Sequence, residues 1–301
     1  MKISAKIITH SISPDNVELI TYEIVLPKVL LAEFNTHRML SKNLSSSRAI
    51  PTKAFIEVDS FEPLYYGKNQ AGMVAADERL VDEDLQHAQQ TWKFAIDECK
   101  NASSYLATLG LHKQWANRPN DWHTMARGIA SGTEWDNFFY LRNHDDAQPE
   151  IHELARLMLE AKNASTPFML HPGEWHLPYI ELFKYKETKE LGYFTDKDGA
   201  PNILTLEDAK KISVSCCAQV SYRKQDDSLE KAERVYAMLN IGSTTKPNHS
   251  SPLEHLATPM RLLRGKTGAW EDGVTHMDRR GILWSANFQG WVQYRKLIEA
   301  L

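Results

Sequence analysis

Residues 33–51 read EFNTHRMLSKNLSSSRAIP, a helix-compatible segment joined to a run of hydroxyl, amide and guanidinium side chains. We expect a helix that ends near Leu40 and a polar loop after it. Residues 45–47 offer hydroxyl and backbone donors, and Arg38 and Arg48 can each add charge-assisted hydrogen bonds worth about 1.5 to 3 kcal/mol. The segment is therefore a candidate binding site for oxygen anions, although a Ser-rich stretch by itself is more often a polar surface loop.

The segments around this stretch predict both strands and helices. Residues 3–26 alternate apolar and polar positions or are β-branched, with a turn at 14–16, and predict a β-hairpin. Apolar residues recur every three or four positions over residues 82–109, which predicts a long amphipathic helix. Residues 149–162 and the residues after Ser228, a candidate N-cap, predict two more helices. This pattern favours an α+β fold with an antiparallel or mixed sheet packed against long helices.

Composition and charge exclude several classes of protein. The chain has 301 residues, 42% of them hydrophobic and 25% charged, as in an ordinary globular protein. No repeat or Gly/Ser-rich joint divides it, so we expect a single domain over residues 1–301 with an insertion at about 166–208. A net charge of -4 provides no general attraction for nucleic acid or an acidic membrane.

Cysteine use and hydropathy favour the cytoplasm. The three cysteines form neither a CxxC motif nor a disulfide framework, which fits a reducing compartment. No apolar run approaches the roughly 20 residues that span a bilayer, and the first residues lack a secretory signal. We therefore expect a soluble protein.

Two more arginines lie next to predicted helices. Arg118 lies in KQWANR, directly after the long helix, and Arg142 lies in NFFYLR. We expect Phe138, Phe139 and Leu141 in the core. Asn137 and Arg142 then lie at the edge of buried surface, where an unpaired guanidinium is costly. Arg142 could therefore bind a ligand, or it could form a structural ion pair with Asp145, Asp146 or Glu150.

The remaining candidate motifs do not predict metal binding. The stretch HSSPLEH, residues 249–255, lacks the helical spacing of a zinc-binding histidine pair, and Pro252 prevents a continuous helix. Cys216 and Cys217 lie in the apolar, strand-like run ISVSCCAQVSY, so we expect buried structural thiols there.

Together these stretches resemble the flavin-dependent thymidylate synthases. The hallmark of that family is Arg-His-Arg, seven residues and then Ser, and it is matched here by Thr36-His37-Arg38, residues 39–45 and Ser46. The sequence AQPEI after Arg142 is similar to the family's Ala-Gln-x-Glu-Ile. Residues 249–255 match its His-x-Ser/Thr-Pro-Phe-Glu-His element.

The order of these motifs differs from that of the family. The element at 249–255 normally precedes the arginine motif but here comes last, as does its forerunner, a short Ala-x-Val-Ser-Tyr strand expected at 218–222. A circular permutation that opens the chain before the strand at residue 17, as in a phage-type member, explains the new order. The resemblance covers residues 17–56, 82–160 and 212–260, and leaves 166–208 and 261–301 unaccounted for.

The resemblance implies a role for each matching residue. Arg142 would be the catalytic group that polarises the pyrimidine. The implied substrate-binding residues are Glu33, Ser46, Ser47, Arg48, Arg118 and Arg142. The implied flavin-binding residues are His37, Arg38, Asn43, Asn137, His249 and Ser251.

Three residues depart from the family pattern. Thr36 replaces the first arginine of the hallmark, and Leu44 replaces an acidic residue. Glu33 stands where the family usually has a glutamine near the pyrimidine. A carboxylate only accepts hydrogen bonds whereas an amide also donates, so the preferred base or sugar could differ from that of dUMP.

The implied function is FAD-dependent methylation of dUMP at C5, with methylenetetrahydrofolate and NADPH as co-substrates, by a cytoplasmic homotetramer without metal. One alternative on the same scaffold is C5 hydroxymethylation, or methylation of UMP or dCMP. Another is a noncatalytic nucleotide-binding protein that lost its chemistry with Thr36 and Leu44.

Overall fold

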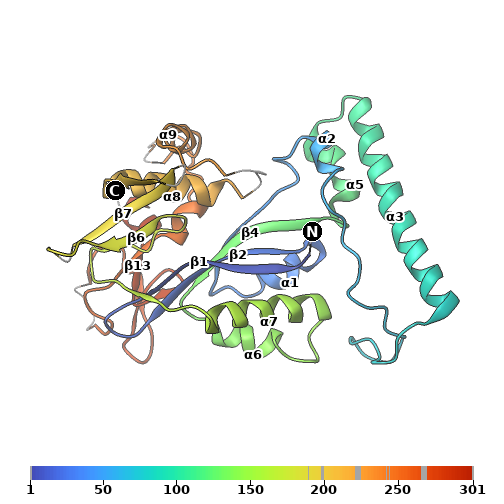
Figure 1. Cartoon of the computed structure of the whole chain (residues 1–301), viewed down its shortest axis with the longest axis horizontal. Coiled ribbons are helices and arrows are strands. Elements are labelled where there is room, and N and C mark those ends of the chain that lie inside the picture. Colours follow the sequence, from blue (N-terminus) through green and yellow to red (C-terminus); the bar gives the residue numbers. More distant parts are fainter. Residues whose placement is uncertain are drawn as a thin grey trace.

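A five-stranded sheet forms the centre of the molecule, with the strand order β3-β4-β2-β1-β5 (Figure 1). The computed structural model describes residues 2–188, 190–197, 200–220, 225–241, 243, 245–265 and 270–299. The strands of the central sheet are β1 (Ser4–Ile12), β2 (Glu18–Pro27), β3 (Ser41–Leu44), β4 (Met125–Gly132) and β5 (Phe168–Met169). The neighbouring strands β3, β4, β2 and β1 pair antiparallel, and β5 pairs parallel with β1. This arrangement, with the helices described below, confirms the predicted mixed helix-and-sheet class.

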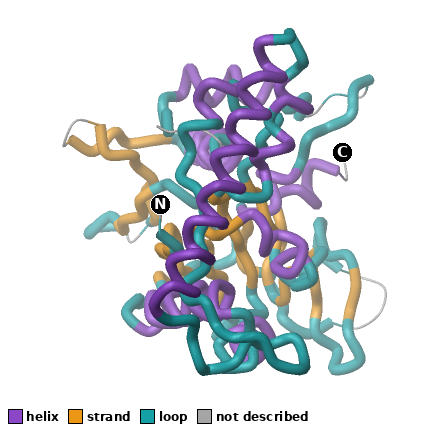
Figure 2. Tube along the Cα trace, turned by 90° about the vertical axis from the view of Figure 1, so that its right-hand side faces the viewer, coloured by secondary structure: helices purple, strands orange, loops and turns teal. Residues whose placement is uncertain are grey.

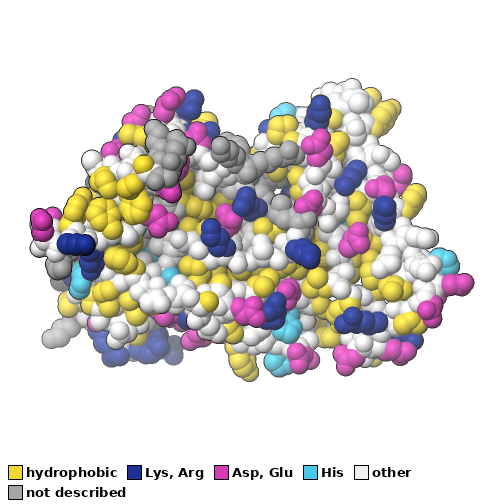
Figure 3. Space-filling view, in the orientation of Figure 1, with side chains coloured by type: hydrophobic (Ala, Val, Ile, Leu, Met, Phe, Trp, Pro, Cys, Tyr) yellow, Lys and Arg dark blue, Asp and Glu magenta, His cyan; other side chains and the backbone are white. Residues whose placement is uncertain are grey.

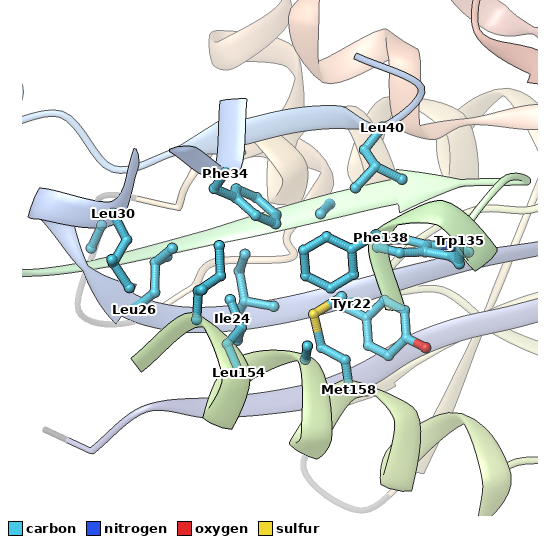
Figure 4. Packing of buried hydrophobic residues seen from close by; sticks show 14 of the residues in the cluster. Tyr22, Ile24, Leu26, Leu30, Phe34, Leu40, Trp135, Phe138, Leu154 and Met158 are labelled. Atoms are coloured by element: carbon cyan, nitrogen blue, oxygen red, sulfur yellow. The ribbon is translucent and has the colours of Figure 1, made fainter. Parts of the chain in front are cut away.

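Helices α6 (Asp136–Arg142) and α7 (Pro149–Asn163) cover one face of this sheet. Because side chains alternate along a strand, Tyr22 and Ile24 of β2 point to this face and pack with Leu154 and Met158 of α7 (Figure 4). The short η1 (Lys28–Leu30) and α1 (Leu31–Asn35) join the same core through Leu30 and Phe34. One apolar core therefore positions both α1 and α6.

The opposite face of the sheet carries a row of buried hydroxyl groups. Its members lie opposite one another on β1, β2, β4 and β3, and are Thr9, Thr21, Ser131 and Ser41. His176 Nε2 lies 2.8 Å from Thr21 Oγ1, and His255 Nδ1 lies 2.8 Å from Ser131 Oγ. Burial lowers the pKa of both imidazoles to about 3, so neutral rings link this row to the chain beyond residue 170.

Elements from the C-terminal half, here called the C-terminal lobe (residues 170–299), cover that hydroxyl face. Its helices are α8 (Leu206–Ala218), α9 (Leu229–Met238), the 3-10 helix η2 (Ser251–His255) and α10 (Tyr294–Glu299). Its strands are β6 (Glu181–Lys184), β7 (Leu191–Lys197), β8 (Ala200–Leu204), β9 (Ala257–Pro259), β10 (His276–Met277), β11 (Leu283–Ser285), β12 (Phe288–Gln289) and β13 (Trp291–Gln293). They form three small sheets, β6-β7-β8, β10-β11-β12 and β13-β9.

Helix α3 (Asp82–Thr108) stands at the edge of the molecule (Figures 1 and 2). The short α2 (Thr52–Phe55), α4 (Lys113–Ala116) and α5 (Arg118–Asp121) connect it to the rest. Of its 27 residues, all of which the structure describes, only Ile96 and Ser103 are buried. Phe94 and Tyr105 are about two-thirds exposed, at 66% and 65%. Much of this amphipathic helix therefore has no apolar partner within the described chain.

The predicted hairpin and the three predicted helices are confirmed. The predicted helix to Leu40 is too long, because α1 ends at Asn35 and strand β3 begins at Ser41. Leu141, expected in the core, is 45% exposed, whereas Phe138 is buried as expected.

The strand predicted around Cys216 and Cys217 is wrong. Both residues lie in helix α8, whose N-cap Thr205 accepts a hydrogen bond from Asp208 N, and both thiols are buried as expected. Ala218 ends this helix and residues 219–220 form a turn, so no strand begins at 218. Positions 221–222 of the predicted strand lie outside the described residues.

Candidate active site around Arg142

Arg142, the last residue of α6, is held by two side chains from the 33–51 stretch. Its Nε donates to His37 Nε2 at 2.9 Å, and its Nη1 forms an ion pair with Glu33. Glu33 lies 109 residues earlier in the chain. The acidic partner of Arg142 among the described residues is thus none of the nearby acids Asp145, Asp146 and Glu150. Glu150 instead accepts a hydrogen bond from Leu64 N at 2.9 Å. Glu33, His37 and Arg142 are called the base cluster below.

His37 is neutral in this cluster. Burial, assisted by the positive charges of Arg142 and Lys42, lowers its pKa to about 4. A guanidinium can only donate, so His37 Nε2 is the acceptor and the ring proton is on Nδ1. The ring also meets Phe138 edge to face, with centroids 5.0 Å apart. The neutral imidazole therefore holds Arg142 in place without adding a second positive charge beside the guanidinium.

Lys42 of β3 supports the turn that carries His37. Its Nζ donates to the carbonyl oxygen of His37 and, at 3.3 Å, to that of Phe34. Burial lowers the pKa of Lys42 to about 8, so the ammonium still predominates at neutral pH. This side chain joins the C-terminal end of α1 to strand β3.

A cavity of about 600 Å³ opens beside the base cluster. Glu33 and Arg142 line it together, and aromatic walls come from Phe61, Trp92 and Trp122. Its volume lies in the usual range for small-molecule sites, about 300 to 1,000 Å³. A carboxylate acceptor next to a guanidinium donor, within apolar walls, suits a planar polar ring.

Strand β3 lies unusually close to β4. A Cβ atom at Gly128 of β4 would lie 2.5 Å from Asn43 O and 2.4 Å from Leu44 Cδ2, so only glycine allows this approach. Asn43 Nδ2 donates to Cys217 O at 2.6 Å, and β3 also packs against η2, which begins at Ser251. The structure therefore brings strand β3, which carries Asn43, next to the 249–255 motif.

Ser46, Ser47, Arg48 and Arg118 form a second group, called the phosphate cluster below. Ser47 O accepts from Asn117 Nδ2 at 2.7 Å, which places the serine turn beside α5 and Arg118. Arg118 forms an ion pair of 2.8 Å with Asp121, and its side chain is 48% exposed. Arg48 is exposed as well. Figure 3 shows Lys and Arg side chains along β4 on the face drawn there.

The hydroxyl of Ser47 is buried yet unsatisfied. Its Oγ has no hydrogen-bond partner among the described residues, although the residue is only 2% exposed. A buried polar group without a partner is costly, so this atom is suited to a ligand oxygen.

The other predicted flavin residues are exposed and take no part in the hydrogen bonds that build these clusters. Arg38, Asn137, His249 and Ser251 are all exposed. No hydrogen bond or ion pair joins the side chains of Arg38, Asn137 or His249 to either cluster in the described part of one chain.

Several residues around the site are not apparent from the sequence. Lys42 and the aromatic residues of the cavity wall belong to no recognisable sequence motif. Asn287 and Gln293, which contact Ser41, lie in NFQGWVQYRK, where amides interrupt an aromatic run and provide the one available signal.

The described residues contain no group of three or more His, Cys, Asp and Glu side chains arranged to hold a metal ion. No helix among them has the length and apolar character needed to cross a membrane.

Comparison with known proteins gives one family and a set of solved structures. A family model described as thymidylate synthase complementing protein matches residues 7–168, more than half of the chain. A UMP/dUMP methylase, PolB, from Streptomyces cacaoi bound with 5-Br UMP is 16% identical, over 56% of this chain and 90% of that one, with a TM-score of 0.45. ThyX from Helicobacter pylori complexed with FAD and dUMP is 25% identical, over 48% of this chain and 67% of that one, with a TM-score of 0.34. No curated protein sequence matches the chain.

Proposed function

Because this chain belongs to the thymidylate synthase complementing proteins, a family of flavin-dependent thymidylate synthase-type enzymes, we propose that it methylates dUMP at C5. The one-carbon donor in this proposal is methylenetetrahydrofolate and the reductant is NADPH. The observation that most directly supports this proposal is that Arg142, held by Glu33 and His37, lines the cavity beside α1.

Arg142 acts on the base in this proposal. Its guanidinium donates to a carbonyl oxygen of the pyrimidine and stabilises the negative charge that develops on the ring. A preorganised donor of this kind contributes about 3 kcal/mol to transition-state stabilisation. The side chain is only 20% exposed, so little water screens this interaction.

Glu33 reads the neighbouring position of the base. Uracil presents its N3–H as a donor beside two carbonyl oxygens, and a carboxylate can accept that hydrogen bond while Arg142 donates to the oxygen. Cytosine instead presents a bare N3 and an amino group. The replacement of the family's glutamine by Glu33 is the specific observation behind the second candidate, methylation or hydroxymethylation of another pyrimidine: UMP, which shares the uracil ring, or dCMP, whose amino group could donate to the carboxylate.

The phosphate cluster holds the 5′-phosphate. Arg48 and Arg118 supply charge, and Ser46 and Ser47 supply hydroxyls, including the unsatisfied Ser47 Oγ. The ion pair between Arg118 and Asp121 is half exposed and therefore weak, so the guanidinium can turn to a phosphate at small cost.

The residues present fit a flavin. Exposed donors at Arg38, Asn137 and His249 suit the oxygen-rich edge of FAD and its pyrophosphate, and Asn43 and Ser251 lie on elements that pack together. When bound, FAD supplies the hydride chemistry. The chain's own contribution is to bind and orient that group and to exclude water from the base.

The proposal includes a homotetramer in which α3 packs against other copies. The supporting observation is the apolar surface that α3 leaves exposed. We also propose that residues 1–301 form one domain, because the C-terminal lobe covers a face of the central sheet. The cytoplasm is part of the proposal as well, in line with the reducing compartment that the cysteines indicate.

Two measurements test the function. Purified protein should absorb at about 450 nm from bound flavin, or after FAD is added. It should release tritium from C5-labelled dUMP only when folate and NADPH are both present. A colourless protein that takes up no FAD but binds nucleotide would support the noncatalytic alternative, and a labelled product from dCMP or UMP alone would support the second candidate.

A further inference from the structure

Two amides of the C-terminal lobe contact the first residue of β3. Gln293 Nε2 donates to Asn287 Oδ1 at 2.8 Å and to Ser41 Oγ at 3.3 Å. Asn287 Nδ2 donates to the same hydroxyl at 3.2 Å. Gln293 and Ser41 are buried, so these hydrogen bonds are protected from water. Ser41 is therefore held by two side chains that lie 246 and 252 positions later in the chain.

Ser41 begins a series of contacts that ends at the base cluster. The next residue, Lys42, donates to the carbonyl oxygen of His37. The ring of His37 accepts from Arg142 Nε. Each step is one covalent or hydrogen-bond contact, so a continuous series of contacts joins the start of β3 to the guanidinium.

We propose that Asn287, Gln293 and Lys42 are positioning residues for Arg142. They keep β3 and the turn after α1 in register, so that the guanidinium meets the base at the geometry that turnover needs. The proposal rests on the proposed function of Arg142. A displacement of about 1 Å at a catalytic group can cost about a hundredfold in rate, so contacts remote from the substrate can matter this much.

Five variants separate positioning from stability. Lys42→Met keeps the length of the side chain and removes its donors, whereas Lys42→Arg keeps both charge and donors. Gln293→Leu removes the amide, and Gln289→Leu is the matched control, because the side chain of Gln289 contacts Arg280 and not Ser41. Ser41→Ala removes the shared hydroxyl from a small side chain and repeats the test if Gln293→Leu does not fold.

The first readout needs no turnover. In protein labelled with ¹⁵N-histidine, His37 should appear as a single neutral form with its proton on Nδ1, assigned by its loss in His37→Gln. Lys42→Met and Gln293→Leu should shift this signal or split it between tautomers, while Lys42→Arg and Gln289→Leu should leave it unchanged. An unchanged His37 signal in folded Lys42→Met and Gln293→Leu, or in Ser41→Ala, overturns the inference.

The second readout is kinetic. Lys42→Met and Gln293→Leu should lower kcat for tritium release about tenfold or more, with a smaller change in the KM of the nucleotide. Lys42→Arg should retain most of the kcat of the unmodified protein. Equal losses in Lys42→Met and Lys42→Arg, or in Gln293→Leu and Gln289→Leu, would contradict positioning. If the unmodified protein releases no tritium, the proposed function fails, whereas the His37 signals still decide the inference.

Discussion

The base cluster and the phosphate cluster differ in how far the fold completes them. Arg142 is 20% exposed and is held by both a carboxylate and an imidazole. Arg118 is 48% exposed with Asp121 as its partner, and Arg48 is exposed. The fold therefore builds the first guanidinium into a fixed donor and leaves the second group open for its ligand. We infer that the base cluster governs the rate and the phosphate cluster governs binding.

Arg142→Ala is the most severe test of the difference between the two clusters. Turnover should fall at least a hundredfold, because a preorganised donor worth about 3 kcal/mol is lost, while flavin binding persists. Tritium release and absorbance at about 450 nm measure the two effects. Undiminished turnover would remove Arg142 from the mechanism.

Arg48→Ala and Arg118→Ala should act on affinity. Each removes a charge-assisted hydrogen bond of about 1.5 to 3 kcal/mol, so KM for the nucleotide should rise about tenfold to a hundredfold with kcat nearly constant. Added salt should weaken binding by the unmodified protein more than by the variants. A fall in kcat with constant KM would show that this cluster, too, acts in the transition state.

Glu33→Gln tests which base the first cluster reads. The amide can donate to the bare N3 of cytosine, so the ratio of kcat/KM for dUMP over dCMP should fall about tenfold. Glu23→Gln, which changes a carboxylate paired with Arg127 on β2 and β4, is a suitable control. A shift toward dUMP would favour dCMP as the natural substrate.

Protonation of His37 should change stability only below neutral pH, so at pH 7 this is the smallest of the predicted effects. Burial and the charges of Arg142 and Lys42 lower its pKa to about 4, from about 6.5 in the unfolded chain. The neutral ring therefore stabilises the fold fully above about pH 6.5, and this contribution is lost as the pH falls through about 4. Urea unfolding of the unmodified protein and of His37→Gln should converge over that range.

The exposed His87 of α3 provides the control for this measurement. His87→Gln should follow the unmodified protein throughout. If His37→Gln also follows it in parallel at every pH, the imidazole contributes no pH-dependent stability and its contact with Arg142 is too weak to matter.

Local patterns predicted most of the secondary structure. The hairpin, α3 and α7 follow from periodicity and caps that lie within each segment. Helix α8 was missed because residues 212–217 carry no charge and are all buried, and periodicity cannot separate a fully buried helix from a buried strand. The burial that decides this case comes from the elements around α8.

The candidate site could be predicted as a set of residues but not as a set of contacts. The hallmark spacing identifies His37 and the stretch NFFYLR identifies Arg142, yet their hydrogen bond joins elements 105 residues apart. Sequence proximity favoured Asp145, Asp146 or Glu150 as partners of Arg142, and tertiary packing brought Glu33 there instead. The supports from Asn287 and Gln293 arise in the same way, from a lobe that the motifs do not cover.

The contact of Ser41 with Gln293 has a consequence during biosynthesis. Ribosomes add about 5 to 20 residues per second, so the 252 residues between the two take roughly 10 to 50 seconds to synthesise. Throughout that interval β3 lacks the amides that contact its first residue, even though the hairpin of β1 and β2 can already form. The contacts of Ser41 with Asn287 and Gln293 can thus form only after residues 287–293 have left the exit tunnel.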